Sequence, residues 1–158
     1  DHSVEQLDFA LRRRFLWVEA TYSAESLLSI CESRWHKLSW SGRREFKWEE
    51  VESDFKRLVK AATALNATIA TEEELGKDFM LGHVFFLDAV SFLYTFLNSY
   101  SNSLSNYLFK SKGAWREPIS KLWKLSLYPL LKEYLAGLEK SQQEDIIQKL
   151  KASFKPES

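Results

Sequence analysis

Apolar residues recur at steps of three and four between residues 48 and 69, the spacing that places them on one face of an α-helix. They are Trp48, Val51, Phe55, Leu58, Val59, Ala62, Leu65 and Ile69. The positions between them carry charge and are expected to face solvent. These are Glu49, Glu50, Glu52, Asp54, Lys56, Arg57 and Lys60. Acids lead and bases follow, which suits the helix dipole, so the pattern predicts a long amphipathic helix.

Two further helices are predicted on either side of this one. An earlier helix runs from Ser23 to about Lys37, and residues 39–47 form a loop. The second covers most of the run from Met80 to Leu97, which is apolar on nearly every face and becomes helical near residue 83. A membrane span is disfavoured because Asp88 lies inside the run, and a charge near the bilayer centre costs about 2.5–3.5 kcal/mol on insertion scales. We therefore expect a central core helix.

The C-terminal third of the chain is punctuated by prolines. Residues 99–113, rich in Ser and Asn, predict a loose connection with one helical turn at 104–109. Pro118 suits the first turn of the helix that follows. Pro129 should kink or divide that helix, because proline lacks the N–H of an interior helical residue.

Two tetrapeptides have the spacing of a capping box. Thr71–Glu74 is expected to open a short turn before Gly76, and Ser141–Glu144 to begin a last helix. That helix would turn its apolar residues, Ile146, Ile147 and Leu150, toward the core. Residues 155–158 are expected to be disordered.

Only Phe15–Glu19 has the character of a strand. A single strand cannot make a sheet, so it must pair with something outside this sequence or rearrange. With five Gly and three Pro in 158 residues, the rest of the chain favours long helices.

Composition narrows the possible partners and location. The formal net charge is +0, from 22 basic and 22 acidic side chains, so no global field draws the chain to nucleic acid or membrane. The single cysteine, Cys31, excludes an internal disulfide and fits a reducing compartment. We expect a cytoplasmic protein.

Three consecutive arginines, Arg12, Arg13 and Arg14, directly precede the apolar run Phe15–Val18. The guanidinium group is always charged, and its rigid fork of donors fits phosphate. The alternative is that all three are solvated or form salt bridges within the chain.

The residues around this tract resemble a known family. Asp1-His2-Ser3 followed by residues 7–15 is similar to the stretch after sensor 1 in AAA+ NTPases of the McrB type, which usually reads Asp-Arg-Ser where this chain has His2. Downstream, Leu65-Asn66, Ile69 and residues 74–83 resemble the lead-in to the family's Gly-His-Ser-Tyr-Phe motif. Here that motif reads Gly82-His83-Val84-Phe85-Phe86 and lacks the serine and tyrosine. Residues 128–135 are similar to part of its C-terminal helix.

McrB-type proteins are the GTP-hydrolysing motors of modification-dependent restriction systems. The resemblance implies an all-α fold, a helical AAA+ lid subdomain preceded by one strand as a short remnant of the α/β core. Residues 1–22 would end the core, residues 23–154 would form the lid, and residues 155–158 the tail. It also implies GTP or ATP with Mg²⁺ in the full-length assembly, a homo-oligomeric ring, a possible partner nuclease subunit, and DNA contacts only through regions outside this chain.

The resemblance assigns roles to six residues. Arg12, Arg13 and Arg14 would include the catalytic arginine finger, with Arg12 and Arg13 favoured. The nucleotide-binding candidates are Asp1, Gly82 and His83. In related proteins the start of the helix at His83 carries the sensor 2 position, but no arginine stands here. His83 could instead cap a helix or form a hydrogen bond in the core.

Other chemistry finds little support in the chain. It contains neither a Gly-rich phosphate loop nor a Walker B acid pair, so the isolated chain is expected not to hydrolyse nucleotide. The three histidines and Cys31 are too scattered in sequence to indicate a metal site. Arg43-Arg44 beside aromatic residues could bind single-stranded nucleic acid, but a loop with core aromatics is favoured. The main alternative function is a stand-alone helical interaction module that binds protein through exposed Trp115 or Trp40.

Overall fold

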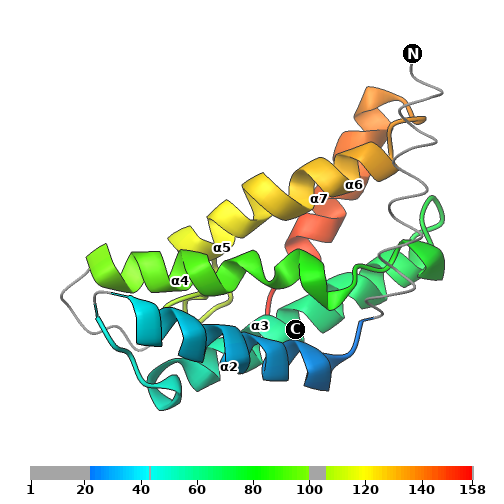
Figure 1. Cartoon of the computed structure of the whole chain (residues 1–158). Helices are drawn as coiled ribbons and strands as arrows, with labels where there is room; N and C mark the ends of the chain where they lie inside the picture. The colour runs from blue at the N-terminus through cyan, green and yellow to red at the C-terminus, as the bar shows by residue number, and fades with distance from the viewer. Residues whose placement is uncertain (1–21, 43, 100–105, 158) are drawn as a thin grey trace.

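Two helices joined by a short connection form the first layer of the fold (Figure 1). The computed structural model describes residues 22–42, 44–99 and 106–157. Helix α2 (Ala24–Ser41) begins at the N-cap Ser23, whose hydroxyl accepts a hydrogen bond from the Ser26 N–H. It runs about one turn beyond the predicted end. The buried Ser39 hydroxyl bonds the N–H and the carbonyl of Phe46, at 2.8 and 3.1 Å, and this holds the connection against the helix end.

Helix α3 (Trp48–Thr71) confirms the predicted amphipathic helix. The Glu50 carboxylate accepts the N–H of Lys47 at 2.9 Å and so satisfies one of the free donors at the helix start. The buried face packs on α2 and on α7, with the ring of Trp48 stacked on Phe55 at 5.4 Å between centroids. The solvent-facing assignment is wrong at Asp54, which is 2 % exposed.

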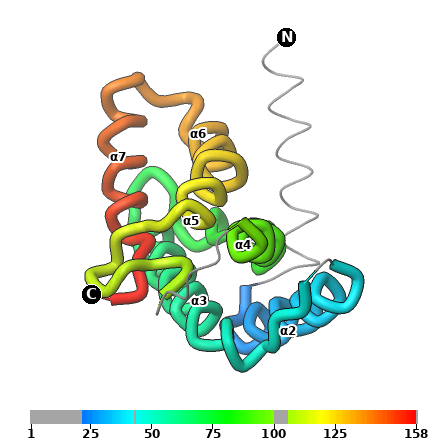
Figure 2. Tube along the Cα trace, turned by 90° about the vertical axis from the view of Figure 1, so that its left-hand side faces the viewer, coloured from blue at the N-terminus to red at the C-terminus, as the bar shows by residue number. Residues whose placement is uncertain are grey.

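The predicted apolar helix near His83 begins as the 3₁₀ helix η2 (His83–Phe86) and becomes α-helical in α4 (Asp88–Ser99). Helix α4 packs against both α2 and α5, and in Figure 2 it lies between them. It is not apolar all round, because one narrow stripe of polar residues remains exposed. The stripe consists of Asp88, Ser91, Thr95 and Ser99.

The segment that links α3 to η2 turns at Gly76, whose φ of 100° places it in a region that favours glycine. The Gly76 N–H reaches the Ile69 carbonyl at 3.0 Å and closes the C-terminal end of α3. The predicted turn before Gly76 is therefore present, and the short 3₁₀ helix η1 (Lys77–Phe79) follows it. The predicted capping box is wrong, because Thr71 ends α3 and its hydroxyl donates back to the carbonyls of Ala67 and Thr68.

Residues 106–116 form a tight hairpin-like turn instead of the predicted helical turn, which is wrong for residues 106–109. Phe109 and Trp115 make an isolated antiparallel bridge, and the Lys110 N–H donates to the Ala114 carbonyl at 2.7 Å. The turn requires φ of 79° at Gly113, where an added Cβ would also meet the Lys155 side chain at 3.3 Å.

A π-helical turn, η3 (Trp123–Leu127), separates α5 (Glu117–Leu122) from α6 (Tyr128–Tyr134). Pro118 lies in the first turn of α5, as predicted. Pro129 lies in the first turn of α6, and the Tyr128 N–H just before it bonds the Trp123 carbonyl five residues back. The backbone stays helical from residue 117 to residue 134, so Pro129 does not divide the helix in two, and its effect is this π-helical turn just before it. The wider turn re-pairs backbone groups next to a residue that cannot donate.

Helix α7 (Lys140–Ser153) packs on α3 and α6 and buries Ile146, Ile147 and Leu150, as predicted. The predicted capping box is wrong, because the N-cap is Glu139 and no side chain caps the helix. Beyond the helix, Phe154 is buried and the Glu157 carboxylate lies 2.6 Å from the Arg57 guanidinium.

The described part of the chain is all-α and contains no strand. The predicted strand Phe15–Glu19 lies outside the described residues. The proposed division into residues 1–22, 23–154 and 155–158 stays a prediction, but residues 155–157 of the expected disordered tail have defined positions, and Glu157 pairs with Arg57.

Candidate functional site

Only two of the six predicted site residues, Gly82 and His83, lie within the part of the chain that the structure describes. Asp1, Arg12, Arg13 and Arg14 lie outside it, so their roles stay predictions. The site can therefore be built from the lid side alone, beginning with what holds residues 81–83 in place.

Asn66, on the buried face of α3, clamps the backbone just before Gly82. Its side-chain NH₂ donates to the Leu81 carbonyl at 2.9 Å, and its side-chain oxygen accepts the Leu81 N–H at 2.7 Å. Asn66 and Leu81 are 1 % and 0 % exposed, so water does not compete for these bonds. The amide thus satisfies both polar groups of a buried residue that belongs to no helix.

Gly82 and His83 follow this clamp directly. Gly82 is buried in an extended conformation and precedes the first residue of η2, which is His83. His83 is half-buried, and its Nδ1 atom is buried without a hydrogen-bond partner among the described residues. The sequence analysis allowed His83 to cap a helix or to form a hydrogen bond in the core, and Nδ1 does neither among the described residues. The imidazole therefore keeps one unused hydrogen-bonding atom.

Aromatic packing fixes the other end of η2. The Phe86 ring, fully buried, lies 6.2 Å edge-on to Tyr22 and 6.1 Å from Phe154. Tyr22 in turn bonds α3, with its hydroxyl 2.6 Å from the Thr63 hydroxyl. The end of η2 is thus held from α3 through Tyr22 and from the residue that follows α7 through Phe154.

A buried carboxylate that sequence reasoning placed in solvent organises a second polar cluster. The Asp54 carboxylate accepts the N–H groups of Tyr107 and Leu108 at 2.7 and 3.3 Å, whereas its Oδ2 has no partner among the described residues. Burial raises the pKa of Asp54 above its usual range, although these N–H groups and the guanidinium groups of Arg57 and Arg116 oppose the shift.

Arg57 completes this cluster. Its guanidinium donates to the carbonyls of Phe109 and Lys110 at 2.7 and 3.0 Å and pairs with Glu157. The cluster therefore fastens the 106–110 segment and the chain end to α3. The signal was available in the sequence: position 54 lies three residues after Val51 and four before Leu58, on the apolar stripe.

The aromatic residues near Arg43-Arg44 mostly belong to the core, as favoured from sequence. Trp48 is 6 % exposed, and Phe46 packs on Trp35 and Tyr94 at 6.4 and 5.9 Å. Arg44 lies over the Phe46 ring at 4.8 Å, whereas Arg43 lies outside the described residues. Trp40 differs from them, because it is 92 % exposed at the end of α2.

The described residues offer little support for thiol chemistry, for a metal site or for a membrane span. Burial raises the pKa of the Cys31 thiol to about 12, which disfavours the nucleophilic thiolate. Within residues 22–42, 44–99 and 106–157, no group of three or more His, Cys, Asp or Glu side chains is arranged to hold a metal ion. None of the helices described is both long and apolar enough to cross a bilayer.

Comparison with known proteins supports the resemblance read from the sequence. The profile of the family described as McrB, alpha-helical lid domain, matches residues 57–143, more than half of the chain. No curated protein and no solved structure matches the chain. The match includes the Asn66 clamp, Gly82-His83, η2 and all of α4 to α6. The chain therefore belongs to the McrB alpha-helical lid domain family.

Proposed function

We propose that this chain is the C-terminal part of an AAA+ NTPase of the McrB type that hydrolyses GTP or ATP in a DNA restriction or defence motor. Residues 1–22 would be the end of the AAA+ core, including one strand of its sheet, and residues 23–154 the lid. The observation that carries the proposal is the family match over residues 57–143. The ordered matches at residues 1–15 support the part that precedes it.

In this proposal the arginine tract acts on a neighbouring subunit. Negative charge on the γ-phosphate oxygens must be stabilised during transfer, and an arginine supplied from another subunit can do this. Such a finger raises turnover by about 10³–10⁵ in other NTPases. Arg12, Arg13 and Arg14 would include that group, reaching a triphosphate held across a subunit boundary.

The lid would act on the nucleotide of its own subunit through Gly82 and His83. The Asn66 bonds to Leu81 and the packing of Phe86 hold this segment rigidly against α3. His83 is only half-buried, so in the proposal its imidazole would meet the nucleotide from the first residue of η2, although not through Nδ1, which is buried. A rigid lid can convert hydrolysis into a rigid-body rotation against the core.

The remaining parts of the proposal concern the assembly. GTP or ATP with Mg²⁺ would be bound by the full-length protein, with Asp1 on the core side of the site. The protein would form a homo-oligomeric ring through the finger interface and work with a nuclease subunit. DNA would be contacted by regions outside this chain, and the location would be cytoplasmic.

The decisive experiment is subunit complementation with the full-length protein. Arg12→Ala, Arg13→Ala and Arg14→Ala are compared with Arg34→Ala, an exposed arginine on α2. We expect at least one tract variant to lose about 10³-fold or more in kcat while still assembling with nucleotide. Mixing it with subunits that lack a working phosphate loop should restore part of the activity. Turnover within about threefold of wild type for all three variants would contradict the finger role.

His83 is tested separately, because its role is in the same subunit. His83→Ala should weaken binding of a fluorescent guanine or adenine nucleotide and should not be rescued by mixing with phosphate-loop-deficient subunits. His83→Val, which fills similar space without a polar atom, separates the chemical effect from packing. Unchanged nucleotide affinity in both variants would remove His83 from the site.

One observation favours the alternative of a helical protein-interaction module. Trp40 is 92 % exposed, and exposed tryptophan is enriched at the centres of protein interfaces. In that case Trp40→Ser would abolish partner binding without affecting the fold. A coding sequence for Gly-x-x-x-x-Gly-Lys-Ser/Thr directly upstream in the same reading frame favours the motor.

A further inference from the structure

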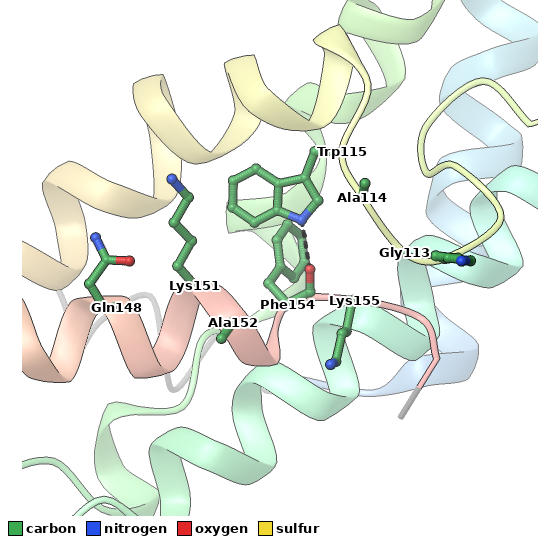
Figure 3. A pocket seen from close by; sticks show the side chains of 9 residues that line it. Gly113, Ala114, Trp115, Gln148, Lys151, Ala152, Phe154 and Lys155 are labelled. Carbon is green, nitrogen blue, oxygen red and sulfur yellow. Dashed lines mark hydrogen bonds between the residues drawn. The ribbon is translucent and has the colours of Figure 1, made fainter.

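Two adjoining grooves lie where the 112–115 turn, α5 with η3, and α7 meet. The larger has a volume of about 400 Å³ and is drawn in Figure 3; the second, of about 320 Å³, continues from it toward Tyr128. Trp115 and Lys151 line both, so the two form one continuous surface. Neither groove includes Gly82 or His83. We call this surface the lysine groove.

The floor of the lysine groove is aromatic and rigid. The Trp115 indole lies 5.4 Å from Trp123 and 5.8 Å from Phe154, measured between ring centroids. The Trp115 indole N–H donates to the Phe154 carbonyl at 2.9 Å, which Figure 3 marks with a dashed line. Trp123 and Phe154 are 6 % and 0 % exposed. The floor is therefore set by core packing and needs no rearrangement to receive a ligand.

The rim carries positive charge without nearby compensation. Four of the lining residues are lysines and none is an acid: Lys112, Lys124, Lys151 and Lys155. The Lys151 ammonium lies 5.4 Å from the centre of the Trp115 ring, over the apolar floor. None of the four is ion-paired with a described residue. By contrast, Lys149 on the same helix pairs with Glu72 at 2.8 Å.

We propose that the lysine groove binds an acidic peptide segment that carries one apolar anchor residue. The chain has no net charge, so four unpaired ammonium groups around one groove are a local asymmetry and not a general property of its surface. Carboxylates on the peptide would face the ammonium rim, and the anchor would rest on the Trp115 floor. This complementarity steers association and sets specificity.

A nucleic acid fits the groove less well because of the kind of cation that lines it. Phosphate recognition favours the guanidinium fork, and no arginine lines either groove. Lysine, a point charge without fixed geometry, suits carboxylates spaced along a flexible peptide.

The probe is a short fluorescein-labelled peptide rich in Asp and Glu with one central Phe, measured by fluorescence anisotropy with the whole chain. Three probes of the same length accompany it: the peptide with Asn and Gln in place of the acids, the peptide with Ala in place of Phe, and oligothymidylate. We expect the acidic Phe peptide to bind at least about tenfold more tightly than any of the others.

The protein variants test the place of binding. Lys151→Glu combined with Lys155→Glu should weaken the acidic peptide by about tenfold or more, and circular dichroism should confirm that these exposed substitutions leave the fold intact. The charge-matched control is Lys60→Glu combined with Lys140→Glu, two exposed lysines of α3 and α7 that line neither groove. It should change affinity by less than about twofold. Backbone amide shifts in a ¹H–¹⁵N spectrum should concentrate at 112–115, 120–128 and 148–155.

Three results would overturn the proposal. Oligothymidylate binding as tightly as the peptide, with a steeper salt dependence, would identify a nucleic-acid surface instead. Equal losses in the Lys60/Lys140 and Lys151/Lys155 variants would show non-specific attraction. Absence of peptide binding at millimolar concentration would exclude the site altogether. None of these results depends on the nucleotide chemistry proposed for the full-length protein.

Discussion

The bonds from Asn66 to Leu81 make the sharpest prediction, because one side chain satisfies both backbone groups of a buried residue outside any helix. In Asn66→Ala and Asn66→Leu, the Leu81 N–H and carbonyl would stay buried without partners. Each unsatisfied group costs about 1–3 kcal/mol, so the two together should lower the free energy of unfolding by about 2–6 kcal/mol.

The two variants separate hydrogen bonding from packing. Asn66→Leu keeps the branched shape at Cγ but adds volume to a packed site, whereas Asn66→Ala leaves a cavity, so a loss shared by both variants reports the missing bonds. The matched control is Asn98→Ala. Asn98 is half-buried and makes its one side-chain bond, at 2.9 Å, to Tyr94 in its own helix. We expect Asn98→Ala to cost about 1 kcal/mol or less.

Urea unfolding of the whole chain, followed by circular dichroism, measures the difference. A loss of 3 kcal/mol should also lower Tm by about 6–12 °C in a domain of this size. Hydrogen exchange should accelerate at residues 80–83 more than in α7. If Asn66→Leu cost no more than Asn98→Ala, the clamp would not stabilise the fold and the rigidity assigned to the Gly82-His83 segment would be refuted.

The remaining predictions concern the buried carboxylate, two glycines and an arginine. The folded-state pKa of Asp54 is raised, so its contribution to stability is present below the unfolded pKa and is lost as pH rises through the folded pKa. Asp54→Asn should therefore gain stability relative to wild type as the pH rises above about 4, and parallel urea-unfolding profiles would contradict this. Gly76→Ala should cost about 1–3 kcal/mol through backbone strain alone, because nothing lies within 4 Å of the added Cβ. Gly137→Ala, equally open and without positive φ, should be neutral or slightly stabilising in thermal unfolding, so equal effects would exclude strain. Arg57→Ala should lower the free energy of unfolding by about 1.5–3 kcal/mol and speed amide hydrogen exchange at residues 106–110. Arg57→Lys should recover less than half of the lost free energy of unfolding. Unchanged exchange at residues 106–110 in Arg57→Ala would show that Arg57 does not fasten this segment to α3.

Local patterns were sufficient for the existence of most helices. The three- and four-residue spacing of apolar residues identified α3, and the N-cap Ser23 and the N-terminal Pro118 marked the starts of α2 and α5. These signals succeed because capping and amphipathicity depend on neighbours within one or two turns. The family resemblance at residues 65–83 depended on sequence motifs alone, and the family match confirmed it.

The errors arose where a distant partner decided the outcome. Asp54 is charged, so it was assigned to solvent, but N–H groups more than fifty residues away cover it. Ser141 has the right spacing for a cap, yet α7 begins before it, at Lys140. The turn at residues 106–116 depends on the cluster of Asp54 and Arg57 and on positive φ at Gly113, neither of which the local composition reveals.

The sequence by itself determined the helical class, the family and the place of Gly82-His83 in the family's motif, because all of these reside in short-range patterns. Tertiary structure alone decided that Asn66 pairs with Leu81, that Arg57 meets Glu157 a hundred residues away, and that lysines from a turn, η3 and the end of α7 surround one aromatic floor. The physical reason is that such contacts join elements far apart in the chain. Their geometry follows from how the helices pack against one another, and no single segment encodes it.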